Sequence, residues 1–162
     1  MNFTENFEKL SELTKDIKFC MLTTTDIEGL LRSRPLTTQS AGLEDCLWFF
    51  ISAAGTLSDE LRNSPNVNLS YTDPNHNRYV SVSGKAEVIR DRAKAEKMWN
   101  PTFKAWFPEG LDDPNLALLK IEVEQAEYWD APSSRLVQIE GFLKASTTSE
   151  RVEKTSEHKA IH

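Results

Sequence analysis

Residues 30–58 read LLRSRPLTTQSAGLEDCLWFFISAAGTLS, and the rest of the chain is arranged around this stretch. Its first part, Leu30–Leu36, has the composition of a β-strand. Arg32 and Arg34 share one face of that strand, because alternate residues of a strand point the same way. Its second part, Cys46–Ser52, is apolar on both faces, which predicts a buried strand.

The segment that follows the second strand offers groups for an anionic ligand. Ser52, Thr56 and Ser58 carry hydroxyls, and a helix expected to begin near Thr56 presents free backbone N–H groups and a favourable dipole. Thr56 and Asp59 have the spacing of a capping box. Together, these features predict a binding site for a planar anion: two strands, two arginines and a helix start. Hydroxyls at this position are, however, found more often in an ordinary capped helix.

Two interpretations of the arginine pair are open at this stage. A guanidinium suits bidentate contact with a phosphate or a ring edge, but both arginines could equally lie on the solvent face of an outer strand. Pro35 lacks the N–H needed in a ladder, so it predicts an edge, a bulge or a position beside a ligand.

Composition narrows the class of protein. A length of 162 residues with 39% hydrophobic and 27% charged residues predicts one globular domain. The net charge of −6 argues against general nucleic-acid binding. The apolar runs are far shorter than the roughly 20 residues of a membrane span. Glu5 and Glu8 lie where a signal region would be apolar, so we expect a cytoplasmic protein without a membrane partner.

The pattern along the chain predicts a mainly β (α+β) domain over residues 1–143 and a polar, mobile tail over residues 144–162. Gly84 indicates a bulge, Asp91 a helix cap, and Cys20 and Cys46 buried thiols. Strands joined mostly by hairpins favour a small antiparallel barrel with peripheral helices. About six strands are expected, near residues 18–25, 30–39, 46–52, 66–72, 79–88 and 117–130, with a short addition at 135–139.

Familiar catalytic motifs are absent from the sequence. No cysteine–histidine or histidine–carboxylate cluster has zinc-ligand spacing, and no phosphate-binding glycine loop or nucleophile elbow is present. Chemistry at such a site would therefore come from a cofactor. Trp106 and Trp129 lie in turn-rich segments, where each could pack on a flat ligand, a dimer mate or the core.

Several of these motifs together resemble the FMN-binding split barrels related to pyridoxamine 5′-phosphate oxidase. Residues 106–114, which contain WFPEG and DDP, are similar to the general stress protein 26 branch, and the resemblance covers residues 7–139. The shorter motifs that carry it are Arg34-Pro35-Leu36, Trp48-Phe49-Phe50, Val67-Asn68-Leu69-Ser70-Tyr71 and Tyr128-Trp129-Asp130.

The resemblance implies a six-stranded antiparallel split β-barrel that forms a homodimer with flavin at the subunit interface. It places strand two along the flavin, the loop after strand three at the phosphate and two tryptophans beside the ring. With the arginine pair included, the predicted cofactor-binding residues are Arg32, Arg34, Pro35, Leu36, Gln39, Ser52, Thr56, Ser58, Trp106 and Trp129.

The implied cofactor is FMN, with FAD or weak FMN binding as alternatives. Relatives carry threonine, serine and lysine in the phosphate loop where this chain has Ile51, Gly55 and Leu57, and loss of a charge-assisted phosphate contact costs about 1.5–3 kcal/mol. The implied function is a general-stress-type, FMN-dependent oxidoreductase of unknown substrate, reduced by NAD(P)H or another donor. The alternative is a non-catalytic flavin-binding or sensing module. Vitamin B6 oxidation is not expected, because the C-terminal substrate motif is missing.

Overall fold

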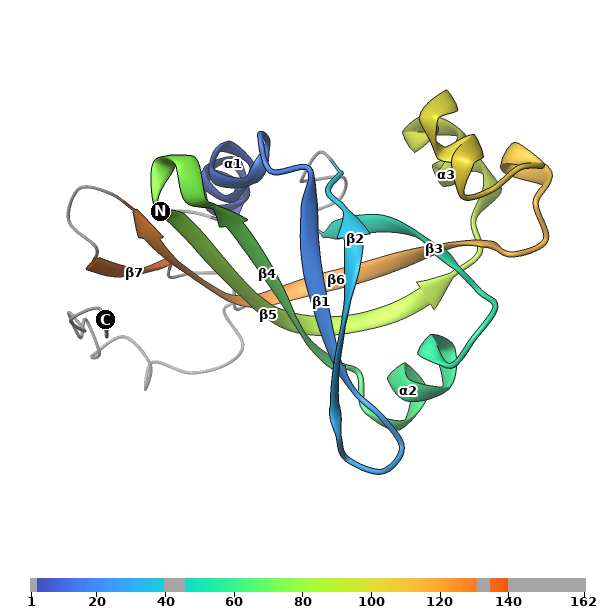
Figure 1. Cartoon of the computed structure of the whole chain (residues 1–162), viewed down its shortest axis with the longest axis horizontal. Helices are drawn as coiled ribbons and strands as arrows, with labels where there is room; N and C mark the ends of the chain where they lie inside the picture. Colours follow the sequence, from blue (N-terminus) through green and yellow to red (C-terminus); the bar gives the residue numbers. More distant parts are fainter. Residues whose placement is uncertain (1–2, 40–45, 131–134, 140–162) are drawn as a thin grey trace.

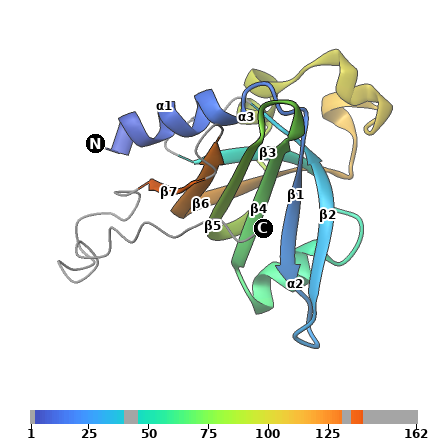
Figure 2. The same ribbon diagram turned by 60° about the vertical axis from the view of Figure 1, so that its left-hand side comes forward.

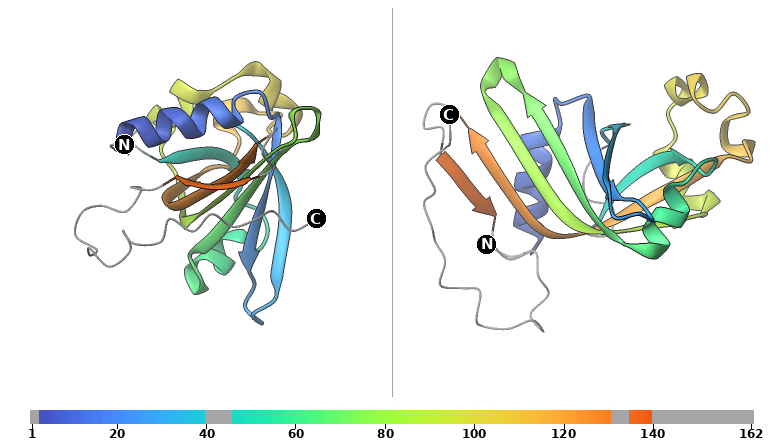
Figure 3. Two further views of the ribbon diagram at one scale, coloured as in Figure 1. Left: turned by 90° about the vertical axis from the view of Figure 1, so that its left-hand side faces the viewer. Right: turned by 60° about the horizontal axis from the view of Figure 1, so that its bottom comes forward.

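An antiparallel sheet, curled into a half-barrel, organises the molecule (Figures 1 and 3). The computed structural model describes residues 3–39, 46–130 and 135–139. The strand order is β2-β1-β4-β5-β6-β3, so β2 and β3 are the two edges, and β7 pairs with β6 beside this path. The strands are β1 (Phe19–Thr25), β2 (Leu31–Thr37), β3 (Leu47–Ser52), β4 (Asn66–Asp73), β5 (Arg78–Ile89), β6 (Leu116–Asp130) and β7 (Arg135–Ile139).

The predicted fold class is confirmed: six antiparallel strands form a split barrel, and the short strand at 135–139 is present as well. Pro35 lies in an edge strand, as its missing N–H required. The predicted tail, residues 144–162, lies outside the described residues, and so does the domain boundary at residue 143.

Helices cover the sheet at separate places (Figure 2). Helix α1 buries Phe7, Leu10 and Leu13 in the main core, as their helical spacing predicts, whereas α3 packs in a second cluster with residues of β3. In the part of the chain that the structure describes, no helix is long and apolar enough to cross a membrane. The helices are α1 (Phe3–Thr14), α2 (Leu57–Asn63) and α3 (Arg92–Met98), with 3₁₀ turns η1 (Pro74–His76), η2 (Pro101–Ala105) and η3 (Gly110–Asp112).

Strand β3 is apolar on both faces because it separates two clusters of buried side chains. Its Leu47, Phe49 and Ile51 face the main core inside the half-barrel. Trp48 and Phe50 face a second cluster under α3 and η2. Although β3 is an edge strand, both of its faces are therefore covered, and Trp48 is a core residue as expected.

A bulge adjusts the pairing of the two longest strands. The β5–β6 register shifts between Ser83 and Gly84, as the glycine predicted. A Cβ on Gly84 would overlap the carbonyl oxygen of Glu122, so only glycine fits this close approach. Cys20 and Cys46 are buried thiols, also as expected.

The start of α2 differs from its prediction. The Thr56 side chain makes no capping hydrogen bond to the backbone, so the proposed capping box is wrong. Its Oγ1 instead donates to a carboxylate oxygen of Glu60, 2.8 Å away, and Asp59 pairs with Arg62 at the surface. The cap predicted at Asp91 is confirmed, because its carboxylate accepts from the Lys94 N–H at 3.0 Å.

Candidate functional site

A cleft of about 540 Å³ opens between the two edge strands of the sheet. Strand β2 forms one wall, and β3, the following loop and η2 form the other. Since β2 and β3 each lack a neighbour on one side, their backbone N–H and C=O groups along this seam are unpaired by the sheet and can bind a ligand. The lining residues are Phe19, Arg32, Arg34, Pro35, Leu36, Thr37, Phe50, Ile51, Ser52, Ala54, Gly55, Thr56, Leu57, Phe103, Trp106 and Phe107.

Aromatic side chains dominate the wall opposite β2. Phe50, Phe103 and Phe107 are buried in the second apolar cluster, with Phe50 and Phe103 ring centroids 4.8 Å apart. Trp106 also lines the cleft, yet 70% of it is exposed. A large aromatic residue that lies beside a cleft without burying itself is available to cover a flat ligand.

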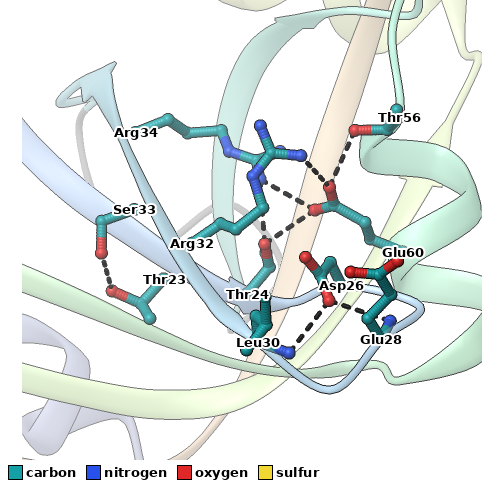
Figure 4. Close-up of polar contacts among 10 residues, drawn as sticks. All are labelled: Thr23, Thr24, Asp26, Glu28, Leu30, Arg32, Ser33, Arg34, Thr56 and Glu60. Carbon is teal, nitrogen blue, oxygen red and sulfur yellow. Dashed lines mark hydrogen bonds and ion pairs between the residues drawn. The ribbon is translucent and has the colours of Figure 1, made fainter.

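A polar cluster centred on Glu60 lies beside the cleft (Figure 4). Arg34 Nη2 donates to Glu60 Oε2 at 2.8 Å, and Arg32 Nη1 donates to Oε1 at 3.2 Å. Thr24 Oγ1 donates to Oε2 and Thr56 Oγ1 donates to Oε1, each at 2.8 Å. The carboxylate therefore accepts four hydrogen bonds from strands β1 and β2 and from the start of α2.

Glu60 is ionised although only 1% of it is exposed. Burial raises the pKa of its carboxyl, but the hydrogen bonds from Thr56, Arg34 and Thr24 and the positive charge of Arg34 outweigh that effect. The result is a pKa lowered to about 2. At neutral pH the cluster thus contains a fixed negative charge between two arginines.

The two arginines keep guanidinium nitrogens that do not contact Glu60. Arg34 is the more buried, with 26% of its side chain exposed against 54% for Arg32. Arg34 uses only Nη2, which also donates to Thr24 Oγ1 at 3.0 Å. Among the described residues, its Nε and Nη1 have no partner. Both arginines pair with Glu60. The interpretation that they lie unpaired on the solvent face of an outer strand is therefore wrong.

Seven of the ten predicted site residues line the cleft: Arg32, Arg34, Pro35, Leu36, Ser52, Thr56 and Trp106. Gln39 is outside the lining and donates to the Thr37 carbonyl oxygen at 3.3 Å. Ser58 lies on α2, where its carbonyl accepts from Arg62 Nε. Trp129 lies opposite Tyr79 near the far end of β6, so it does not join the cleft of its own chain.

Sequence reasoning missed Glu60 and Thr24. The signal for Glu60 was present, since Leu57, Glu60 and Leu61 have helical spacing and all three are buried. A carboxylate on the apolar face of a helix requires a partner, and Arg34 is that partner. Thr24 carried the weaker signal of an inward position on β1, in register with Arg32.

The loop from β3 to α2 and the residues that flank it carry few polar side chains. Ile51 and Leu57 are buried in the main core. Gly55 has φ +106°, a conformation that side-chain-bearing residues rarely adopt. The Ser52 hydroxyl accepts from the Ala54 N–H at 3.2 Å. Ser52 and Thr56 line the cleft, so two of the three predicted hydroxyls stay beside it.

Comparison with known proteins gives consistent results. A family model described as pyridoxamine 5′-phosphate oxidase like matches residues 5–153. General stress protein 26 of Bacillus subtilis is 35% identical over 86 residues, which are 51% of this chain and 61% of that protein. Protein bli-3 of Neurospora crassa is 29% identical over 136 residues, 76% of this chain and 64% of that protein. The matches thus span less than two thirds of the length of either relative.

A solved structure is similar over almost its whole length. It is described as a general stress FMN/FAD binding protein from the phytopathogen Xanthomonas citri. The two chains are 32% identical with a TM-score of 0.67, and the match covers 87% of this chain and 99% of that one.

Proposed function

Because this chain belongs to the pyridoxamine 5′-phosphate oxidase like family, we propose that it is a flavin-binding protein of the general stress type, with FMN as the first candidate cofactor. The observation that carries the proposal is the cleft at the seam of the half-barrel, where an aromatic wall faces an arginine-bearing edge strand. The description of the X. citri protein as FMN/FAD binding supports the same ligand class.

The residues of the cleft fit the ring system of a flavin. Its volume of about 540 Å³ lies within the usual range of small-molecule sites. The flavin ring is flat, with an apolar face and a polar edge. Trp106 and Phe50 offer apolar surface for the face, and the unused guanidinium nitrogens of Arg34 offer donors for the edge.

We further propose a homodimer with flavin at the subunit interface. Large apolar side chains stay exposed on the outer face beside the cleft: Phe19 on β1 is 50% exposed, Met21 41%, and Leu31 on β2 76%. Phe19 and Met21 are neighbours on one face of β1, whereas Leu31 lies further along the ladder, opposite Thr25. Exposed apolar neighbours such as Phe19 and Met21 mark interaction surfaces. Trp129, remote from the cleft of its own chain, could border a flavin only across such an interface.

When bound, FMN would supply hydride and electron transfer, with NADH or NADPH as the expected donor. The chain's residues would hold and orient the ring: Arg34 at its edge and Trp106 over its face. Among the described residues that line the cleft, none is a histidine, cysteine, lysine or carboxylate, so these residues offer no side chain for proton transfer near neutral pH. That observation favours the second candidate function, a non-catalytic flavin-binding or sensing module.

An absorbance spectrum and an FMN titration followed by flavin fluorescence test the flavin site. We expect saturable quenching at micromolar FMN; a protein that ignores both FMN and FAD contradicts the proposal. NAD(P)H consumption with the flavin-loaded protein and a range of electron acceptors then separates the oxidoreductase, which oxidises NAD(P)H, from the binding module, which does not.

A further inference from the structure

We propose that Glu60 makes this flavin site nearly indifferent to the ligand's phosphate, so that the cleft binds riboflavin almost as tightly as FMN. The inference rests on the proposed flavin-binding function and adds a residue that determines ligand specificity. It follows from three features of the site: the charge balance of the arginine cluster, the immobility of its carboxylate, and the apolar residues of the neighbouring loop.

The first feature is the charge available to a phosphate. Of the described residues that line the cleft, only Arg32 and Arg34 are charged. Both are already paired with Glu60, at 3.2 and 2.8 Å, so the cluster carries one net positive charge instead of two. One positive charge cannot neutralise both negative charges of a phosphate dianion. The net charge of the chain, −6, makes binding of the phosphate still less favourable.

The second feature is that Glu60 cannot withdraw when an anion arrives. Its side chain is 2% exposed, and α2 anchors it through Leu57 and Leu61 in the main core. Hydroxyls from Thr24 and Thr56 hold the same two oxygens. A phosphate that binds the arginines must therefore share them with an ionised carboxylate, and burial reduces screening of the repulsion between the two anions.

The third feature is the chemistry of the neighbouring loop. Leu57 and Ile51 present hydrocarbon to the cleft, and Gly55 presents no side chain. The Thr56 hydroxyl is committed to Glu60 as a donor. The cleft does have an aromatic wall for the flavin ring. Most of the binding energy should therefore come from the ring, which riboflavin and FMN share.

The test compares dissociation constants of FMN and riboflavin for the full chain, Glu60→Gln and Asp59→Asn. Both variants remove one negative charge from α2, but Asp59 is solvent-exposed and paired only with Arg62 at the surface. Glutamine fits the site, because its oxygen can accept from Arg34 and Thr24 while its amide donates to Thr56, and Arg32 is exposed enough to turn away.

For the wild-type chain we expect the two flavins to bind within about threefold of each other. In Glu60→Gln the FMN affinity should exceed the riboflavin affinity by about tenfold or more, since Arg32 loses its carboxylate partner and becomes available to the phosphate while Arg34 stays at the ring edge. Asp59→Asn should keep the wild-type ratio. A wild-type preference for FMN of about a hundredfold, or an unchanged ratio in Glu60→Gln, would overturn the inference.

Failure of the proposed function itself gives a different result. If neither flavin binds any of the three proteins, the flavin assignment fails, and thermal unfolding with inorganic phosphate at matched ionic strength still tests Glu60. Phosphate should then raise the Tm of Glu60→Gln and not that of the wild-type chain; equal shifts would refute the inference. Should Glu60→Gln fail to fold, the wild-type ratio of the two flavin affinities decides.

Discussion

Glu60 Oε2 and Arg34 Nη2 lie 2.8 Å apart, although the two residues are 26 positions apart in the sequence. Their pairing ties helix α2 to the edge strand β2, and Thr24 from β1 joins both of them. The buried carboxylate thereby fixes the arginine at the cleft and limits what that arginine can offer a ligand. Four predictions follow from this arrangement and from the surface beside it.

Arg34→Ala should weaken the binding of FMN and of riboflavin to a similar extent, by about tenfold or more. Arg34 would contact the ring edge that both ligands share, and its loss leaves the negative charge of Glu60 beside the cleft. Fluorescence titration measures both affinities. Arg62→Ala, which removes an exposed arginine of α2 paired with Asp59, is the control, and unchanged flavin affinity in Arg34→Ala would make the assignment wrong.

Stability should depend on pH through Glu60. Its pKa in the folded chain is lowered from 4.5 to about 2, so the unfolded chain binds the proton more tightly. The contribution of Glu60 to the free energy of unfolding is then complete above about pH 5 and is lost as the pH falls through 4.5 towards 2.

Urea unfolding of the wild-type chain and of Glu60→Gln between pH 7 and pH 3 measures this contribution. At pH 7 the variant should be less stable by about 1.5–3 kcal/mol, and the gap should narrow as the pH falls. A gap of constant size over that range would contradict the lowered pKa.

Thr24→Val should destabilise the fold, because it removes the hydroxyl that accepts from Arg34 and donates to Glu60 while keeping the side-chain volume. The expected loss is about 1–3 kcal/mol in the free energy of unfolding. Thr23→Val is the matched control on the outward face of the same strand, where the hydroxyl bonds only to Ser33 at an exposed position. Equal losses in the two variants would mean that the buried cluster contributes nothing special.

Met21→Asp should dissociate the proposed dimer, since it places a charge beside Phe19 on the exposed apolar face of β1. Light scattering after size-exclusion chromatography measures the mass. Ala93→Asp introduces the same charge at an exposed position of α3 and should leave the mass unchanged. A wild-type chain that is monomeric at all concentrations would contradict the dimer directly.

Local pattern was sufficient to predict most elements of this fold. The strands alternate apolar and polar residues, turn residues separate them, and Phe7, Leu10 and Leu13 have helical spacing. All three patterns depend only on residues that are close in the sequence. The edge position of Pro35 and the bulge at Gly84 were also readable, because a missing N–H and a missing Cβ act on the backbone where they occur. The motifs around Arg34 and Trp106 were enough to indicate the family.

Only the tertiary structure decided how the candidate site is composed. Thr56 has the sequence of a helix cap, yet its hydroxyl donates to Glu60, one turn further along α2, whose buried carboxylate also pairs with Arg34. Trp129 matched a family motif, but pairing with β5 places it far from the cleft of its own chain. The sequence by itself determined which strands and helices form, since that depends on local spacing. The curling of the sheet decided that Glu60 meets Arg32 and Arg34, because it brings α2 next to β2. A buried charge is stable only with a partner, and neighbouring sequence does not show which partner that is.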